Sequence, residues 1–275
     1  MYRILLLALC AFAINASANN VPTASPEEVG MSLARLRAAD EVILRAISDN
    51  KTPGAVLAVV RHGKLAYLKA YGNRQTYPTT QPMTTQTVFD MASCTKPMAT
   101  AISAMLLVER GQLRLSDPVS MYLPGFNNWY GEGKDSVTIR VEDLLTHTSG
   151  LPAYAPVKTL AEADGKPNPA KLMAYIAGCK REFKPRADMQ YSCLNYITLQ
   201  NIVERITGQS LRTFAANNIF IPLGMKHTDF LPCTSDKSGK LVNTSQPRWV
   251  ANGEQASLTP IAPTEKQPNG TVKQG

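Results

Sequence analysis

The residues best suited to chemistry are Ser93 and Lys96, in the run Ser93-Cys94-Thr95-Lys96. This run opens a segment that the sequence predicts as a helix over residues 95–110, closed by Gly111. Residues i and i+3 share a helix face, so the Lys96 amine can reach the Ser93 hydroxyl. A helix N-terminus also presents unpaired N–H groups and a positive dipole end to a developing oxyanion. At a helix start, this spacing allows a nucleophilic serine with a lysine as proton acceptor, because the pKa of the amine falls if the amine is desolvated.

The same spacing also occurs at Ser48 and Lys51, where it predicts no site. That run ends a predicted helix over residues 32–49, and a helix C-terminus has the wrong dipole sign for an anion. We interpret it as a solvated helix end. The competing interpretation of Ser93 is an N-cap serine followed by a surface lysine.

A third group, the phenol of Tyr191, precedes a predicted helix over residues 194–206. A phenol close to a lysine can carry a proton between nucleophile and leaving group. The competing interpretation is a tyrosine that packs at a helix entry. Tyr71, in the run Tyr71-Gly72-Asn73, is interpreted as a residue of a turn after a strand. The sequence contains no G-x-S-x-G, which disfavours a nucleophile-elbow hydrolase.

The elements that must position these groups begin with a helix over residues 32–49, capped by Ser32. Strands over residues 55–60 and 65–71 then form a hairpin around His62-Gly63-Lys64, and a polar loop covers residues 72–87. Further helices are predicted over residues 141–145, 170–179, 194–206 and 211–219. A lone hairpin needs more strands for stability, and the polar sequence after Phe230 does not supply them. We therefore expect that C-terminal strands of the sheet are missing from this chain.

Residues 89–96 resemble the nucleophile segment of the serine β-lactamase-related family, which includes class C β-lactamases, DD-peptidases and esterases. Four further segments match the family in the same order: residues 52–55, 113–124, 144–151 and 222–225. Ordered motifs of this kind are far more specific than a lone S-x-x-K. The resemblance covers residues 26–265.

The resemblance implies an α/β (α+β) class and a β-lactamase/transpeptidase-like fold. An antiparallel sheet flanked by helices is joined to a helical domain, here without the C-terminal strands. The expected organisation is a signal peptide (1–18), an N-terminal tail (19–30), the β-lactamase-related domain (31–265) and a truncated tail (266–275). Within the domain, residues 31–90 form the α/β part and residues 91–230 the mostly helical part.

The resemblance also assigns roles to the residues. Ser93 would form an acyl-enzyme, Lys96 would accept its proton, and Tyr191 would pass a proton to the leaving group. The Ser93 N–H would be one oxyanion donor, and His147 would be structural. No cofactor is implied.

Two departures from the family bear on the substrate. Cys193 stands where the family carries an asparagine, so no amide is available there for a substrate carbonyl, and Asn195 is not an obvious substitute. Lys237-Ser238-Gly239 matches the third family motif in letters, but its polar surroundings indicate a turn. We expect hydrolysis of a small ester or a D-amino-acid peptide rather than a β-lactam, with peptidoglycan as a candidate partner. The alternative is a catalytically incomplete fragment or a module that binds penicillin or cell-wall peptides without turnover.

Charge and cysteine content narrow the remaining classes. The net charge of +8 comes from dispersed Lys and Arg residues, which disfavours nucleic-acid binding.

The N-terminus predicts a signal peptide cleaved after Ala18, because Arg3 is followed by an apolar run over residues 4–14 and by small residues before position 19. We therefore expect a periplasmic or secreted protein without a transmembrane anchor. Export leaves Cys94, Cys179, Cys193 and Cys233, among which disulfides are permitted, including Cys94 or Cys179 with Cys193. Cysteine and histidine spacing indicates no metal site.

Overall fold

The computed structural model describes residues 21–76, 79–133, 135–162 and 167–230, together with five short strands further along the chain. The predicted signal peptide and the Lys237-Ser238-Gly239 run lie outside the described residues. Among the helices that are described, none has the length and apolar character needed to cross a bilayer.

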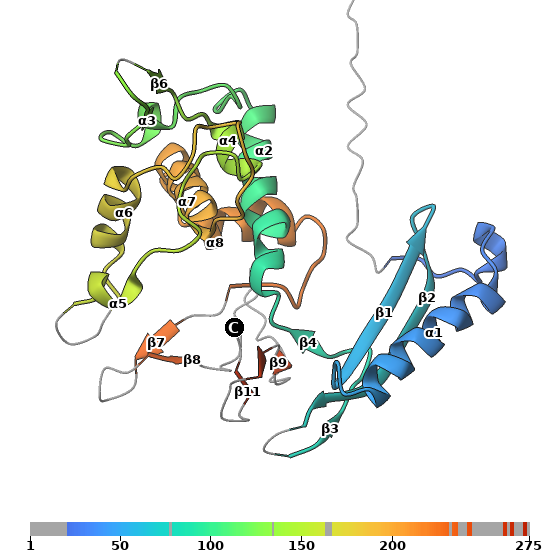
Figure 1. Cartoon of the computed structure of the whole chain (residues 1–275). Helices are drawn as coiled ribbons and strands as arrows, with labels where there is room; N and C mark the ends of the chain where they lie inside the picture. Colours follow the sequence, from blue (N-terminus) through green and yellow to red (C-terminus); the bar gives the residue numbers. More distant parts are fainter. Residues whose placement is uncertain are drawn as a thin grey trace, which may run out of the picture.

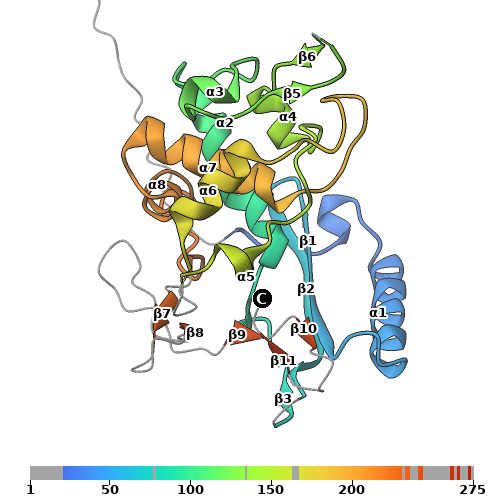
Figure 2. The same cartoon turned by 60° about the vertical axis from the view of Figure 1, so that its left-hand side comes forward.

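The N-terminal part places one helix against a three-stranded sheet (Figure 1). After a short 3-10 turn, η1 (Glu27–Val29), helix α1 (Leu33–Ser48) starts at Ser32, whose hydroxyl accepts the Arg35 N–H. Both views show α1 alongside the hairpin (Figures 1 and 2). The sheet has the order β1-β2-β3 and consists of β1 (Gly54–Arg61), β2 (Lys64–Gln75) and β3 (Gln81–Pro82). The predicted helix and hairpin are confirmed.

The hairpin turn consists of His62 and Gly63, with φ of 51° and 72°. Positive φ at both central residues is the turn geometry that matches the right-handed twist of paired strands. The predicted loop over residues 72–87 is partly wrong, because β2 continues to Gln75 and then pairs with β3. Period-2 alternation is absent there, so the sequence pattern did not mark the extension.

A buried carboxylate joins α1 to the sheet. Asp40 accepts hydrogen bonds from Tyr67 at 2.7 Å and Tyr71 at 2.5 Å, and it also pairs with Lys69. These three partners alternate along β2 and therefore share one face of the sheet. Together they hold the pKa of Asp40 down at about 2, chiefly through the Lys69 and Tyr71 hydrogen bonds.

The second part is mostly helical, and its largest cluster of buried residues surrounds α7 (Cys193–Thr207). Leu194, Leu199, Ile202 and Val203 of this helix are almost fully buried. Helix α7 ends at Gly208, which adopts the left-handed conformation that glycine reaches without a steric penalty. The other elements of this part are α3 (Val119–Tyr122), β5 (Trp129–Tyr130), β6 (Ser136–Val137), α4 (Val141–Leu145), α5 (Val157–Leu160), α6 (Pro169–Gly178), α8 (Leu211–Ala215) and η4 (Ala216–Phe220).

The predicted helix over residues 95–110 exists, but it is not uniformly α-helical. A 3-10 turn, η2 (Ala92–Cys94), leads into the π-helical turn η3 (Lys96–Ala101), which continues as α2 (Ile102–Glu109). Pro97 lies in the first turn, where its missing N–H does least harm. Single π turns within longer helices occur frequently at functional sites.

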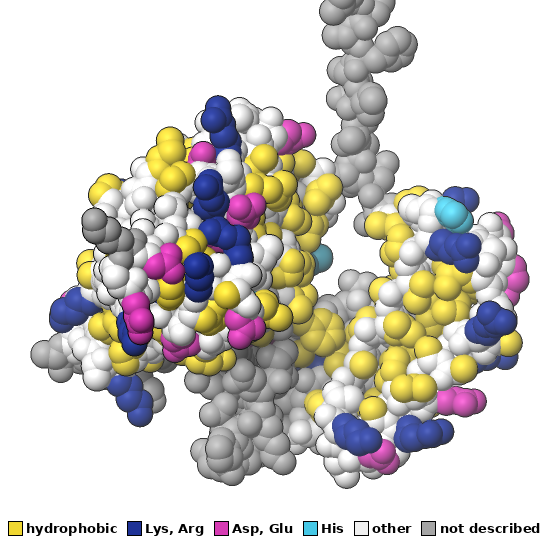
Figure 3. Space-filling view, turned by 45° about the horizontal axis from the view of Figure 1, so that its top comes forward, with side chains coloured by type: hydrophobic (Ala, Val, Ile, Leu, Met, Phe, Trp, Pro, Cys, Tyr) yellow, Lys and Arg dark blue, Asp and Glu magenta, His cyan; other side chains and the backbone are white. Residues whose placement is uncertain are grey.

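Strand β4 (Val88–Phe89) connects the two parts and ends four residues before Ser93. It pairs in parallel with β9 (Ile261–Ala262). Downstream of Phe230, the described residues form only short strands: β7 (Cys233–Ser235), β8 (Leu241–Asn243), β9, β10 (Glu265–Lys266) and β11 (Val272–Lys273). On the face shown in Figure 3, Lys and Arg side chains are interspersed with Asp and Glu.

Candidate active site

Ser93 and Lys96 lie together at the start of the long helix. Lys96 Nζ donates a hydrogen bond to Ser93 Oγ over 3.1 Å. Ser93 is exposed, as a nucleophile must be, and Lys96 is half-buried. The N-cap interpretation of Ser93 is not supported, because neither helical turn at this point has a side-chain cap. Ser48 and Lys51, which have the same spacing, are exposed at the C-terminal end of α1: Ser48 is its last residue, and Lys51 pairs with Asp49 at 3.3 Å.

The backbone just before the nucleophile is strained. Ala92 has a φ of 40°, in the left-handed region that a residue with a Cβ rarely adopts. Its N–H donates to Asp90 Oδ1 over 2.8 Å, which holds the turn. Strain of this kind persists only where the surroundings enforce it, and it is frequent at active sites. The role of Asp90 could not be predicted from the sequence, since an aspartate two residues before an alanine carries no distinctive signal.

Tyr191 is brought to the same place from a distant part of the chain. Lys96 Nζ lies 4.9 Å from the centroid of the Tyr191 ring. Tyr191 remains 43 % exposed. The rival Tyr71 is buried against Asp40 and belongs to the fold. The structure therefore unites Ser93, Lys96 and Tyr191.

The net pKa of Lys96 is raised above its ordinary value. Burial does lower the pKa of Lys96, but the Tyr191 hydrogen bond and the neighbouring Cys193 outweigh it, and the net pKa is raised. Lys96 is therefore an ammonium at neutral pH. In this state it donates to Ser93 Oγ, and it must lose its own proton before it can accept another.

His147 packs against Tyr191 and contacts the start of α7. Its Nδ1 accepts the Ser192 N–H at 3.2 Å and lies 3.2 Å from Asn195 Nδ2. The imidazole packs on the Tyr191 ring with centroids 4.6 Å apart. Burial, followed by the charge of Lys96, lowers the pKa of His147. The backbone N–H of Ser192 and the amide of Asn195 both face Nδ1, so Nδ1 is the acceptor and a neutral ring carries its proton on Nε2. This arrangement is consistent with a structural rather than a catalytic role.

Asn195 does not substitute for a substrate-facing amide. It is 1 % exposed, and its Oδ1 accepts the Ser149 hydroxyl over 2.6 Å. Cys94, Cys179 and Cys193 carry free thiols, so the two disulfides considered for Cys193 are absent from this structure. The side chain of Cys233 lies outside the described residues.

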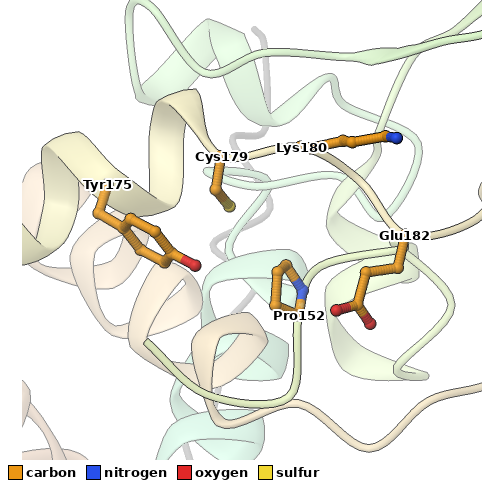
Figure 4. A pocket seen from close by; sticks show the side chains of 5 residues that line it. All are labelled: Pro152, Tyr175, Cys179, Lys180 and Glu182. Atoms are coloured by element: carbon orange, nitrogen blue, oxygen red, sulfur yellow. The ribbon is translucent and has the colours of Figure 1, made fainter. Parts of the chain in front are cut away.

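A pocket elsewhere on the helical part is lined by Pro152, Tyr175, Cys179, Lys180 and Glu182 (Figure 4). Its lining includes none of the three proposed catalytic residues. Over the part of the chain that is described, no group of three or more His, Cys, Asp or Glu side chains is placed to hold a metal ion.

Comparison with solved structures finds similar folds. The fold resembles EstCE1, a hydrolase with promiscuous acyltransferase activity, with a TM-score of 0.62 and 23 % identity over 85 % of this chain and 65 % of that one. It also resembles a class C beta-lactamase mutant, with a TM-score of 0.57 and 26 % identity over 74 % of this chain and 56 % of that one.

Sequence comparison finds relatives among curated bacterial proteins. A putative D-alanyl-D-alanine carboxypeptidase of Escherichia coli (strain K12) is 33 % identical over 83 % of this chain and 55 % of its own length. An N-acetylmuramyl-L-alanine amidase of Bacillus subtilis (strain 168) is 36 % identical over 75 % of this chain and 48 % of its own length. The chain thus spans about half the length of these curated relatives. The family model described as Beta-lactamase matches residues 37–259, and the chain therefore belongs to the beta-lactamase family.

Proposed function

We propose that this chain is an exported serine hydrolase that forms an acyl-enzyme through Ser93. The observation that carries the proposal is the 3.1 Å contact between Lys96 Nζ and Ser93 Oγ, with Tyr191 beside the same amine. A hydroxyl, an amine and a phenol in mutual reach can activate a nucleophile and return its proton to a leaving group.

In the proposed reaction, Ser93 Oγ attacks the substrate carbonyl carbon and its proton passes to deprotonated Lys96. Tyr191 donates its proton to the departing alcohol or amine as the C–O or C–N bond breaks, and Lys96 returns the Ser93 proton to Tyr191. Water then gives a proton to neutral Lys96 as it attacks the acyl-Ser93 ester, and that proton passes to Ser93 Oγ as the acid leaves. The raised pKa of Lys96 means that only a small neutral fraction starts this sequence at neutral pH.

The proposed substrate class rests on the polar groups beside Tyr191. Cys193 presents a thiol, which is a weak hydrogen-bond donor. Asn195 is buried, its Oδ1 accepts from Ser149, and its Nδ2 lies 3.2 Å from His147 Nδ1. A substrate whose carbonyl needs a strong hydrogen-bond donor at position 193 would leave that carbonyl unpaired. We therefore favour small esters or D-amino-acid peptides over β-lactams. The carboxypeptidase and amidase names of the curated relatives support a peptidoglycan-type peptide.

The decisive experiment is intact-mass spectrometry after incubation with a fluorophosphonate and, separately, with a fluorescent penicillin. Ser93→Ala removes the proposed nucleophile, and Ser48→Ala is the matched control because it lies in a run with the same spacing. We expect one covalent adduct in the native protein and in Ser48→Ala, and none in Ser93→Ala. No adduct on folded native protein would contradict the hydrolase. A penicillin adduct that never hydrolyses would instead support a binding module without turnover.

A further inference from the structure

The segment that carries Tyr191 has no regular structure of its own. Helix α6 ends at Gly178 and α7 begins at Cys193, and the described residues between them form neither helix nor strand. Loops of this kind are free to move unless specific contacts hold them. A proton carrier must nevertheless be kept within hydrogen-bond reach of its partner, so the contacts that fix this segment bear on the chemistry.

Backbone hydrogen bonds join this segment to the residues around His147. The N–H groups of Glu182, Arg186 and Gln190 donate to the carbonyls of Gly150, Thr148 and His147 over 2.7, 2.9 and 3.0 Å. At Gly150, which has a φ of 77°, an added Cβ would lie 2.3 Å from the Phe183 carbonyl oxygen. The two backbones therefore lie too close for a side chain at position 150.

Both sides of this junction contain a strained residue. His147 has a φ of 60° and Arg186 a φ of 68°, although neither is a glycine. The left-handed conformation is costly for a residue with a Cβ. Glycine adopts this conformation without a steric penalty, so the backbone at position 186 does not by itself favour an arginine.

The Arg186 side chain makes a specific ion pair. Its Nη1 lies 2.7 Å from Asp143 Oδ2, and the Asp143 side chain is 1 % exposed. The same carboxylate oxygen accepts the Arg140 N–H at the start of α4, which fixes its direction. A buried carboxylate requires such partners, and Asp143 in turn holds Arg186 in its strained conformation.

From these contacts we propose that Arg186 and Asp143 are positioning residues for Tyr191. The ion pair fixes the backbone at position 186 against Thr148, and His147 beside it supports the Tyr191 ring. The inference rests on the proposed function of Tyr191. Neither residue touches the reacting atoms.

The test measures the rate of fluorophosphonate labelling of Ser93 in the full chain, together with thermal unfolding. We expect Arg186→Gly to slow labelling about tenfold or more, because small displacements of a catalytic group are costly. Its Tm should fall, since relief of strain at position 186 offsets only part of the cost of leaving the buried Asp143 carboxylate without this partner. Arg186→Lys should restore most of the rate, because only one nitrogen contacts Asp143 in the structure.

A double-mutant cycle separates positioning from general damage. In a Tyr191→Phe background, Arg186→Gly should change the rate by less than about twofold, because the group that it positions is already gone. Arg212→Met is the matched control, since Arg212 and Asp229 form an ion pair of similar exposure away from Tyr191. It should label at the native rate.

Two results would overturn the inference. One is equal slowing by Arg186→Gly in both backgrounds, and the other is a native rate for Arg186→Gly beside a slow Tyr191→Phe. A native rate for Tyr191→Phe itself would overturn the proposed role of Tyr191, and the positioning role with it.

Discussion

The Lys96 amine lies between the Ser93 hydroxyl, 3.1 Å from its nitrogen, and the Tyr191 ring, whose centroid is 4.9 Å away. The two partners have opposite consequences for catalysis. Ser93 is the group that a neutral amine would deprotonate, whereas the Tyr191 hydrogen bond favours the charged amine and raises the pKa of Lys96. The site is thus assembled with its lysine in the protonated state.

Replacing Lys96 should abolish most of the acylation of Ser93. Lys96→Met removes the amine, and a loss of about 10²–10⁴ in the labelling rate is typical of a lost general base. Lys96→Arg should be nearly as slow, because a guanidinium does not release its proton. Lys51→Met, in the run with the same spacing, should label at the native rate. A fast Lys96→Arg protein would show that positive charge alone suffices.

The labelling rate should rise with pH. The neutral form of Lys96 appears only as the pH approaches its pKa, which is raised above the ordinary value of 10.5. Between pH 7 and pH 10 the neutral fraction therefore grows about tenfold per pH unit, and so should the rate. Labelling reactions quenched at fixed times across this pH range give the slope of the logarithm of the rate against pH, and circular dichroism verifies folding. A flat profile would mean that Lys96 acts as an ammonium and another group is the base.

Cys193→Asn should improve reaction with a fluorescent penicillin. The change adds an amide donor next to Tyr191, and one hydrogen bond of about 0.5–1.5 kcal/mol corresponds to a severalfold faster reaction. Cys193→Ser is the control, since it offers a small polar group without an amide. The penicillin rate divided by the fluorophosphonate rate is the quantity to compare. An unchanged ratio in Cys193→Asn would show that position 193 does not select the substrate.

Asp40→Asn should lower the Tm by several degrees. The substitution weakens the hydrogen bonds from Tyr67 and Tyr71 and removes the charge that pairs with Lys69. The pKa of Asp40 is depressed from 3.8 to about 2, so its stabilising effect is fully present above pH 3.8 and is lost as the pH falls toward 2. Asp49→Asn, at the exposed end of α1, should unfold like the native protein. Identical acid unfolding of native protein and Asp40→Asn would contradict this account.

Gly150→Ala should destabilise the fold more than Gly111→Ala. Both glycines have positive φ, of 77° and 68°, so both variants incur a backbone cost of about 1–2 kcal/mol. Only at Gly150 does the new Cβ also meet a backbone atom, the Phe183 carbonyl oxygen at 2.3 Å, whereas nothing lies within 4 Å at Gly111. Urea unfolding of the two variants gives the comparison. Equal losses would show that the two backbones separate easily.

Much of this arrangement follows from local sequence. Capping residues and apolar spacing act over short distances, so the ends of helices α1 and α7 lie within one residue of those predicted. The hairpin follows from its turn residues, although β2 runs four residues past its predicted end. The pairing of Ser93 with Lys96 was predicted for the same reason, since one helical turn brings them together.

Other features were decided only by tertiary structure. Tyr191 reaches Lys96 across nearly a hundred residues of chain, and the direction of the Lys96 pKa shift depends on that meeting. The ion pair of Arg186 with Asp143, the left-handed backbone at His147 and the burial of Asn195 likewise result from contacts between distant segments. Local spacing determines which side chains share a helix face. Packing determines which partners surround them, and the partners set the charge and position of each catalytic group.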